Sequence, residues 1–191
     1  MKKTMKQSLL LSMSVLTLGA VFPTSVLAQT ESSEVVSEHE MAVSDLQSAL
    51  DLALELFFEQ VPDIGVTYID IDLKEDGSYK IDLQGYNAEG EYDYELRVAG
   101  EEISDEEFDF DDDDDDDDEI LDLDNYLSID EITQIALDTI GSGKVTDWTL
   151  EYDDDRPEWH LELDEVNGDD DDVEITLHAE TGEVLELDDD D

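Results

Sequence analysis

Residues 128–137 read SIDEITQIAL and residues 148–163 read WTLEYDDDRPEWHLEL, and the change of rhythm between these stretches predicts the fold. In the first stretch apolar residues recur every three or four positions, as on one face of a helix. In the second they alternate with polar residues, which is typical of strands that bury one face. The turn between Asp153 and Pro157 is short, so the two strands are expected to pair antiparallel.

The boundaries of this unit are also visible in the sequence. Ser128 and Glu131 have the spacing of a capping box, and the glycines at 141 and 143 predict the end of the helix. A third alternating segment covers Val173–Ala179. The unit is therefore expected to be one helix packed on a three-stranded antiparallel sheet.

The same order occurs earlier in the chain. Residues 45–54 read DLQSALDLAL and align with residues 128–137 at an offset of 83, with Asp45 as the expected capping residue and Pro62 as the expected stop. Three alternating segments follow, at residues 67–73, 79–83 and 92–98. The sequence thus predicts an α+β fold of two tandem modules, each one helix on a three-stranded antiparallel sheet.

The expected domain organisation begins with a secretory signal peptide at residues 1–28. Lysines at 2, 3 and 6 precede a short apolar run, and Val26-Leu27-Ala28 suits cleavage. A retained membrane anchor is the alternative, although a span needs about 20 apolar residues. A flexible lead-in (29–43), module 1 (44–104), an acidic linker (105–126) and module 2 (127–191) follow. We expect a bacterial protein that is secreted, extracellular or associated with the cell envelope.

The charge restricts the partners. The chain has 59 acidic and 8 basic residues, and removal of residues 1–28 leaves five cations and a formal charge of −54. Such a chain repels nucleic acid and anionic membranes, so neither is an expected partner after signal cleavage. Basic protein surfaces and cations are favoured. The absence of cysteine excludes disulfides and thiolate chemistry.

The sequence gives little support for catalysis, so we expect that the protein is not an enzyme. The three histidines are His39, His160 and His178, and His39 lies in the expected lead-in. No His-Glu-x-x-His motif is present, so the chain is not itself a peptidase of that zinc class.

The second unit resembles the PepSY domain. The resemblance rests on the Ser-x-x-Glu helix start, on Gly143-Lys144-Val145, and on residues 179–185, AETGEVL, with His178 where Asp is usual. In the first unit Val98–Ile103 keeps Gly-Glu and the following aliphatic residue but lacks the threonine. The resemblance implies an exported, non-catalytic binding module that regulates or inhibits a peptidase or another protein at the cell envelope. The implied partner is a secreted peptidase or a basic envelope surface.

Two histidines are candidates for a pH-sensitive pair. His160 and His178 alternate with apolar residues, so both should face solvent, and the repeat aligns them with Lys80 and Arg97. Histidine titrates near neutrality, so the pair would change stability or binding between about pH 5 and 7. The alternative is relief of like-charge repulsion by cross-strand pairing.

The aspartate runs suggest a second function, an acidic extracellular protein that binds divalent cations. No calcium loop is present, so there is no defined metal site and no resident cofactor, only loose contact with calcium or magnesium. A solvated polyanion and adaptation to salt are the alternatives. The run between the modules comprises Asp111, Asp112, Asp113, Asp114, Asp115, Asp116, Asp117 and Asp118. Six aromatic residues should face inward, as core or as a ligand platform: Tyr79, Tyr92, Tyr94, Trp148, Tyr152 and Trp159.

Overall fold

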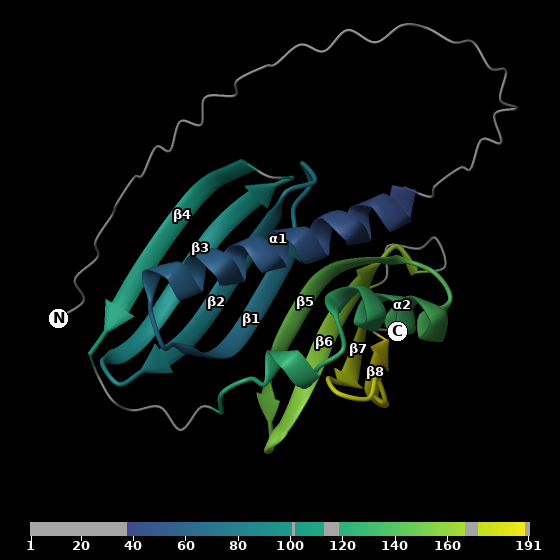
Figure 1. Ribbon diagram of the computed structural model, residues 1–191. Coiled ribbons are helices and arrows are strands. Elements are labelled where there is room, and N and C mark those ends of the chain that lie inside the picture. Colours follow the sequence, from purple (N-terminus) through teal and green to yellow (C-terminus); the bar gives the residue numbers. More distant parts are fainter. Residues whose placement is uncertain (1–37, 101, 113–118, 167–171, 190–191) are drawn as a thin grey trace, which may run out of the picture.

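The computed structural model describes residues 38–100, 102–112, 119–166 and 172–189 (Figure 1). The expected signal peptide and Asp113–Asp118 lie outside these residues. Two helices and eight strands follow one another in the order helix, four strands, helix, four strands. Their bounds are α1 (Glu38–Gln60), β1 (Gly65–Leu73), β2 (Tyr79–Asn87), β3 (Gly90–Ala99), β4 (Glu102–Asp111), α2 (Ile129–Ile140), β5 (Lys144–Asp153), β6 (Arg156–Asp164), β7 (Val173–His178) and β8 (Val184–Asp189), with a short 3-10 helix at Leu123–Asn125.

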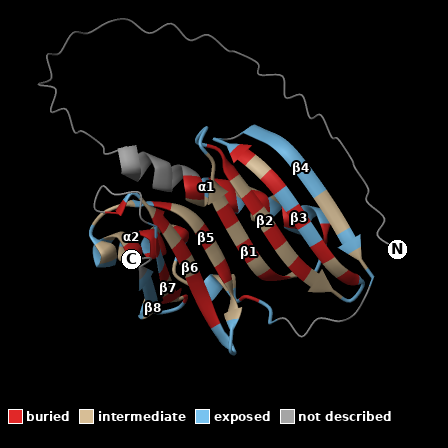
Figure 2. Ribbon diagram, turned by 180° about the vertical axis from the view of Figure 1, so that it is seen from behind, coloured by how far each residue is buried: buried red, intermediate tan, exposed pale blue. Residues whose placement is uncertain are grey.

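The eight strands form one antiparallel sheet in the order β4-β3-β2-β1-β5-β6-β7-β8. The prediction of two modules with separate three-stranded sheets is therefore wrong in two respects: four strands follow each helix, and β1 pairs with β5 to join the halves. Both helices lie on one face of the sheet, and the view from behind shows the other face without a covering helix (Figures 1 and 2).

Strand β4 occupies a segment that the acidic composition predicted to be linker from residue 105. Its Phe108 and Phe110 lie opposite Tyr94 and Tyr92 and contact their rings. Glu106 also occupies an inward position, where its carboxylate accepts hydrogen bonds from the Tyr94 hydroxyl and the Gln60 amide, both at 2.9 Å. These contacts join the exposed Glu106 to β3 and to the end of α1.

Strand β8 follows the turn at residues 179–183 and pairs with β7. The amides of Thr181 and Gly182 donate to the carbonyl of His178, and Gly182 has φ of +68°. A side chain at residue 182 would meet Ile135 of α2 at 2.5 Å. Two features therefore require glycine at position 182: the left-handed backbone conformation and the close approach to α2.

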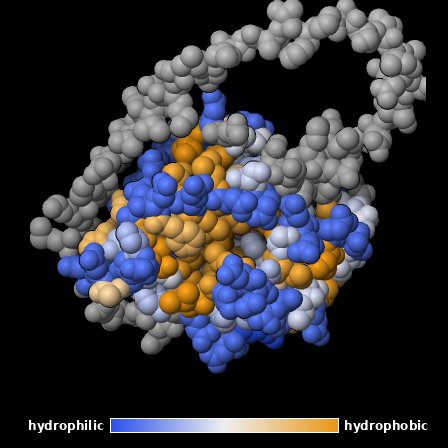
Figure 3. All heavy atoms as spheres, in the orientation of Figure 1, coloured by the Kyte–Doolittle hydropathy of each residue, from blue (hydrophilic) through white to orange (hydrophobic). Residues whose placement is uncertain are grey.

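One continuous core underlies both halves, which corrects the expectation of two separate units. At the junction Ile71 of β1 lies opposite Trp148 of β5, and both are buried. Five of the six aromatic residues named above are buried in this core, and Tyr152 is half-buried, which favours packing over a ligand platform. From the helix side, apolar atoms are visible between the hydrophilic outer side chains of the helices (Figure 3).

The helix ends match the sequence at α2 and differ at α1. Ser128 and Glu131 form the predicted capping box, and Gly141 ends α2 in a left-handed conformation. Helix α1 instead begins at Glu38, so Asp45 lies inside it and does not cap it. Residues 38–43, which include His39 and were expected in the lead-in, belong to this helix.

Candidate functional site

The open face of the sheet is strongly acidic, and its outward side chains form rows that cross the strands. Residues directly opposite one another define one such row from edge to edge. From β4 to β8 it comprises Asp105, Arg97, Lys80, Asp72, Asp147, Glu162, Glu174 and Asp188. The last five, from β1 to β8, are all acidic, and we call them the carboxylate row. Neighbouring strands lie about 4.8 Å apart, so this row brings like charges close together.

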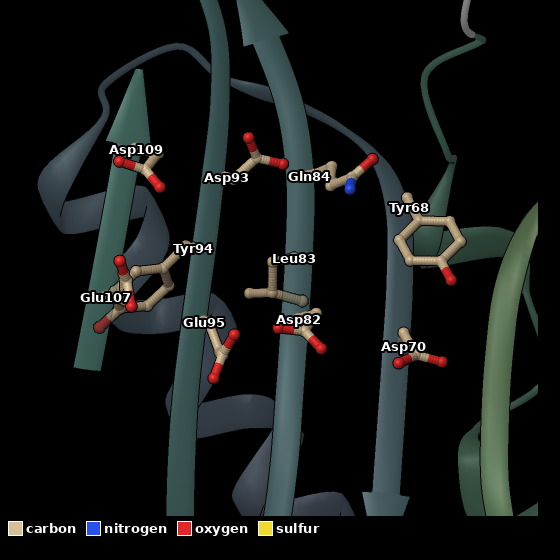
Figure 4. A pocket seen from close by; sticks show the side chains of 10 residues that line it. All are labelled: Tyr68, Asp70, Asp82, Leu83, Gln84, Asp93, Tyr94, Glu95, Glu107 and Asp109. Carbon is tan, nitrogen blue, oxygen red and sulfur yellow. The ribbon is translucent and has the colours of Figure 1, made fainter. Parts of the chain in front are cut away.

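A shallow hollow of about 350 Å³ lies on the same face, over β1 to β4 (Figure 4). Acidic side chains surround most of it, with Tyr68 and Gln84 at one side and Leu83 and Tyr94 at its base. Its carboxylates come from Asp70, Asp82, Asp93, Glu95, Glu107 and Asp109. Such a surface attracts cationic groups and repels anions.

The basic residues near this face are bound to acids. Lys80 contacts Asp82 at 2.6 Å and Glu95 at 3.3 Å. Three further ion pairs join Lys74 to Asp72, Arg97 to Asp76 and Arg156 to Glu158. Acids outnumber these cations on the open face, so the face keeps an excess of negative charge.

Asp147 is the most perturbed acid of the carboxylate row. Burial raises its pKa to about 7, and repulsion by Asp70, Asp72 and Glu162 adds to the effect. Burial also raises the pKa of Asp70, partly offset by a 2.9 Å hydrogen bond from the Thr149 hydroxyl. The pKa of Glu162 rises for the same main reason.

The two candidate histidines both lie on the open face but are not equivalent to Lys80 and Arg97. Those two lie directly opposite each other, whereas His160 faces Thr176 and His178 faces Glu158. In His178, Nδ1 accepts a hydrogen bond of 3.2 Å from the amide of Glu180. His178 therefore supports the turn before β8, a role in which an aspartate oxygen could replace it.

His160 has neighbours that resemble those of a catalytic base. Its Nδ1 lies 3.1 Å from the hydroxyl oxygen of Thr176, and its Nε2 lies 3.7 Å from Glu151. The second distance is too long for a hydrogen bond, so no carboxylate orients the ring. Thr176 lies within a strand paired on both sides, so its neighbouring amides are not available to stabilise an oxyanion.

The predicted cation contacts are only partly within the described residues. Asp111 ends β4 and Asp112 follows it in an exposed position, whereas Asp113–Asp118 lie outside. A group that the sequence did not single out comprises Glu162, Asp164 and Asp172, whose carboxylate oxygens lie within 4.8 Å of one another. Exposed acids commonly gather in this way, and we assign these three no ligand role.

Taken together, the fold and the site define a small α+β protein with an open acidic sheet face. Residues 126–188, from just before α2 into β8, match the PepSY family, described as "Peptidase propeptide and YPEB domain". PepSY is a family of propeptide and regulatory domains that are generally non-catalytic. No curated protein matches the chain.

A solved structure shares the fold. The crystal structure of a candidate lipoprotein from Clostridium difficile 630 aligns with a TM-score of 0.59 at 18% identity, covering 74% of this chain and 92% of that chain. Each unit of one helix and four strands makes up less than half of the chain, so an alignment that covers 74% of the chain includes parts of both units. Among the described residues, no helix has the length and apolar character needed to cross a bilayer.

Proposed function

We propose that this protein is an exported, non-catalytic binding module that regulates or inhibits a peptidase or another protein at the bacterial cell envelope. The observation that carries the proposal is the PepSY match over α2 and β5 to β8. A structural neighbour described as a lipoprotein supports a place at the envelope or outside the cell. The sequence pattern of residues 1–28 supports export.

The N-terminal half is, in this proposal, a second and diverged copy of the same unit. Both halves have the order helix and four strands, and both first strands carry a bulge. The bulges lie at Val66-Thr67-Tyr68 and Val145-Thr146-Asp147, so matching bulge to bulge aligns two Val-Thr pairs. A bulge is typically kept within a family, which supports a common origin of the halves.

The partner contacts the open acidic face and presents a basic surface to it. Charge complementarity favours this face over the helix side, because the hollow and the carboxylate row lie on it. The partner's Lys and Arg side chains would pair with acids of this face, including those that line the hollow. Binding of this kind weakens as salt is added.

Co-purification from culture medium with secreted metallopeptidases, followed by an inhibition assay, tests the proposal. Neutralising two acids of the hollow, Asp82→Asn with Glu95→Gln, should weaken binding. The matched control, Glu55→Gln with Glu59→Gln, removes the same charge from exposed positions of α1 and should bind normally. If no peptidase is bound or slowed at micromolar concentration, the regulatory role is wrong.

Loose binding of calcium or magnesium is a second candidate function. It is favoured by the eight consecutive aspartates, Asp111–Asp118, whose mutual repulsion a divalent cation relieves. Thermal stability in calcium, magnesium and sodium at matched ionic strength tests it. Stabilisation by the divalent ions alone would support this function, and equal effects of all three would indicate plain screening.

A further inference from the structure

The two halves of the sheet meet at a short junction. Strands β1 and β5 pair at four positions only, residues 69–72 with residues 147–150, whereas β1 and β2 pair at eight. On the helix side of the junction the facing pairs are apolar. On the open side Asp70 faces Thr149, and Asp72 faces Asp147.

Two facing carboxyl groups at this junction are unusual, because like charges directly opposite each other destabilise a sheet. The two are not equivalent. Lys74 forms an ion pair with Asp72. Asp147 has no basic residue beside it among the described residues, and its carboxyl is hydrogen-bonded to Asp72. In its protonated form, Asp147 can donate a hydrogen bond to the Asp72 carboxylate across the junction.

The charged groups closest to Asp147 are acids, and the Thr149 hydroxyl, 3.5 Å from its Oδ1, lies nearer to Asp70, at 2.9 Å. On β6 Asp147 faces Glu162, and on β1 it is close to Asp70 as well as Asp72. Tyr68 interacts with Asp147 and with Glu151, and Lys80 is held by Asp82 and Glu95. Lys144, on the same strand, lies opposite Asp164 at the far side of the bulge. The strands packed against Asp147 thus bring acids close to it and no free cation.

We propose that Asp72 and Asp147 form a proton-sensitive connection between the two halves of the sheet. While one proton is shared, the two carboxyl groups bridge β1 and β5. Once the proton is lost, the two carboxylates repel each other and the junction loosens. The halves are then held mainly by the apolar contacts on the helix side. This regulatory device adds to the proposed binding function and does not depend on it.

The direction of the pH dependence follows from the pKa of Asp147, which is raised from 3.8 to about 7 in the folded protein. The folded state binds more protons than the unfolded state between these two values. The stabilisation is therefore complete below about pH 4, declines as the pH rises, and is lost above pH 7. Mild acidity closes the junction, and neutral to alkaline conditions loosen it.

Thermal unfolding of the protein between pH 5 and 8, in EDTA and at constant ionic strength, tests the proposal. Asp147→Asn imitates the protonated side chain, so its melting temperature should exceed that of wild type by about 2–4 °C at pH 8 and by clearly less at pH 5. The matched control, Glu174→Gln, removes one charge from an exposed member of the same row. The increase in melting temperature caused by Glu174→Gln should be small and independent of pH. Equal gains from both variants, or a gain from Asp147→Asn that does not vary with pH, would overturn the proposal.

Amide hydrogen exchange of the wild-type protein gives a test that needs no variant. Protection factors, corrected for the intrinsic pH dependence of exchange, should fall between pH 6 and 8 at residues 69–72 and 147–150. They should change less at residues 173–177 in β7. If protection falls equally at both places, the loss is global and the junction has no special role.

Discussion

Substituting Gly182 by alanine tests whether the turn before β8 packs on α2 as described. The backbone of Gly182 has φ of +68°, a conformation that costs an alanine about 1–2 kcal/mol. The new Cβ would also lie 2.5 Å from Cδ1 of Ile135 and 3.2 Å from Cδ1 of Leu127. Relieving this overlap should cost a further amount of about 1–3 kcal/mol. We therefore expect Gly182→Ala to lower the free energy of unfolding by about 2–5 kcal/mol.

Gly77 provides a matched control for this prediction. It has φ of +79° in the β1–β2 turn, and a Cβ there meets no atom within 4 Å. Gly77→Ala should therefore show the backbone cost alone. The difference between the two variants isolates the contact with α2.

Removing the overlapping methyl should partly rescue the variant. Ile135→Val deletes Cδ1, so the double variant should be more stable than the sum of the single effects predicts. Urea unfolding followed by tryptophan fluorescence is the assay, because Trp148 and Trp159 are both buried in this half. Equal losses in Gly182→Ala and Gly77→Ala, or strict additivity with Ile135→Val, would refute the described packing.

Three further predictions concern other parts of the chain. Glu106→Ala leaves the buried Tyr94 hydroxyl without its acceptor and should cost about 1–3 kcal/mol in urea unfolding, whereas Glu106→Gln, which keeps an acceptor oxygen, should cost less. Ser128→Ala removes half of the capping box of α2 and should cost about 1 kcal/mol in the same assay, and no loss would contradict the cap. If His160 and His178 form a pH-sensitive pair, replacing both by Gln should alter the change in melting temperature between pH 5 and 7. A response that survives this double substitution would belong to the carboxylates of the junction.

Much of the local structure could be predicted from the sequence. Both helices and six of the eight strands follow from apolar spacing, and the capping box at Ser128 and the stop at Gly141 are confirmed. Strand β4 was missed because its inward positions include Glu106, whose partners Tyr94 and Gln60 come from distant parts of the chain. An acid at an inward position resembles a linker until those partners are known.

Pairing between distant strands was harder to predict. The alternation of β1 is the same whether it lies at the edge or in the centre of a sheet, so its pairing with β5 left no signal in the sequence. The alignment of His160 with Lys80 failed for a related reason. When the bulges at Thr67 and Thr146 are superposed, Glu158 takes the position of Lys80, because the β1–β2 and β5–β6 turns differ in length.

The junction explains how two small units with marginal cores form one stable protein. A unit of about 60 residues buries too little surface to be very stable alone, and joining β1 to β5 makes one larger core from two. On the helix side Ile69 and Ile71 face Leu150 and Trp148, and all four are almost fully buried. On the open side, repulsion arises at one of these four positions, where Asp72 faces Asp147. Apolar burial therefore keeps the halves together, and the smaller electrostatic contribution from the open side can alter their connection without separating them.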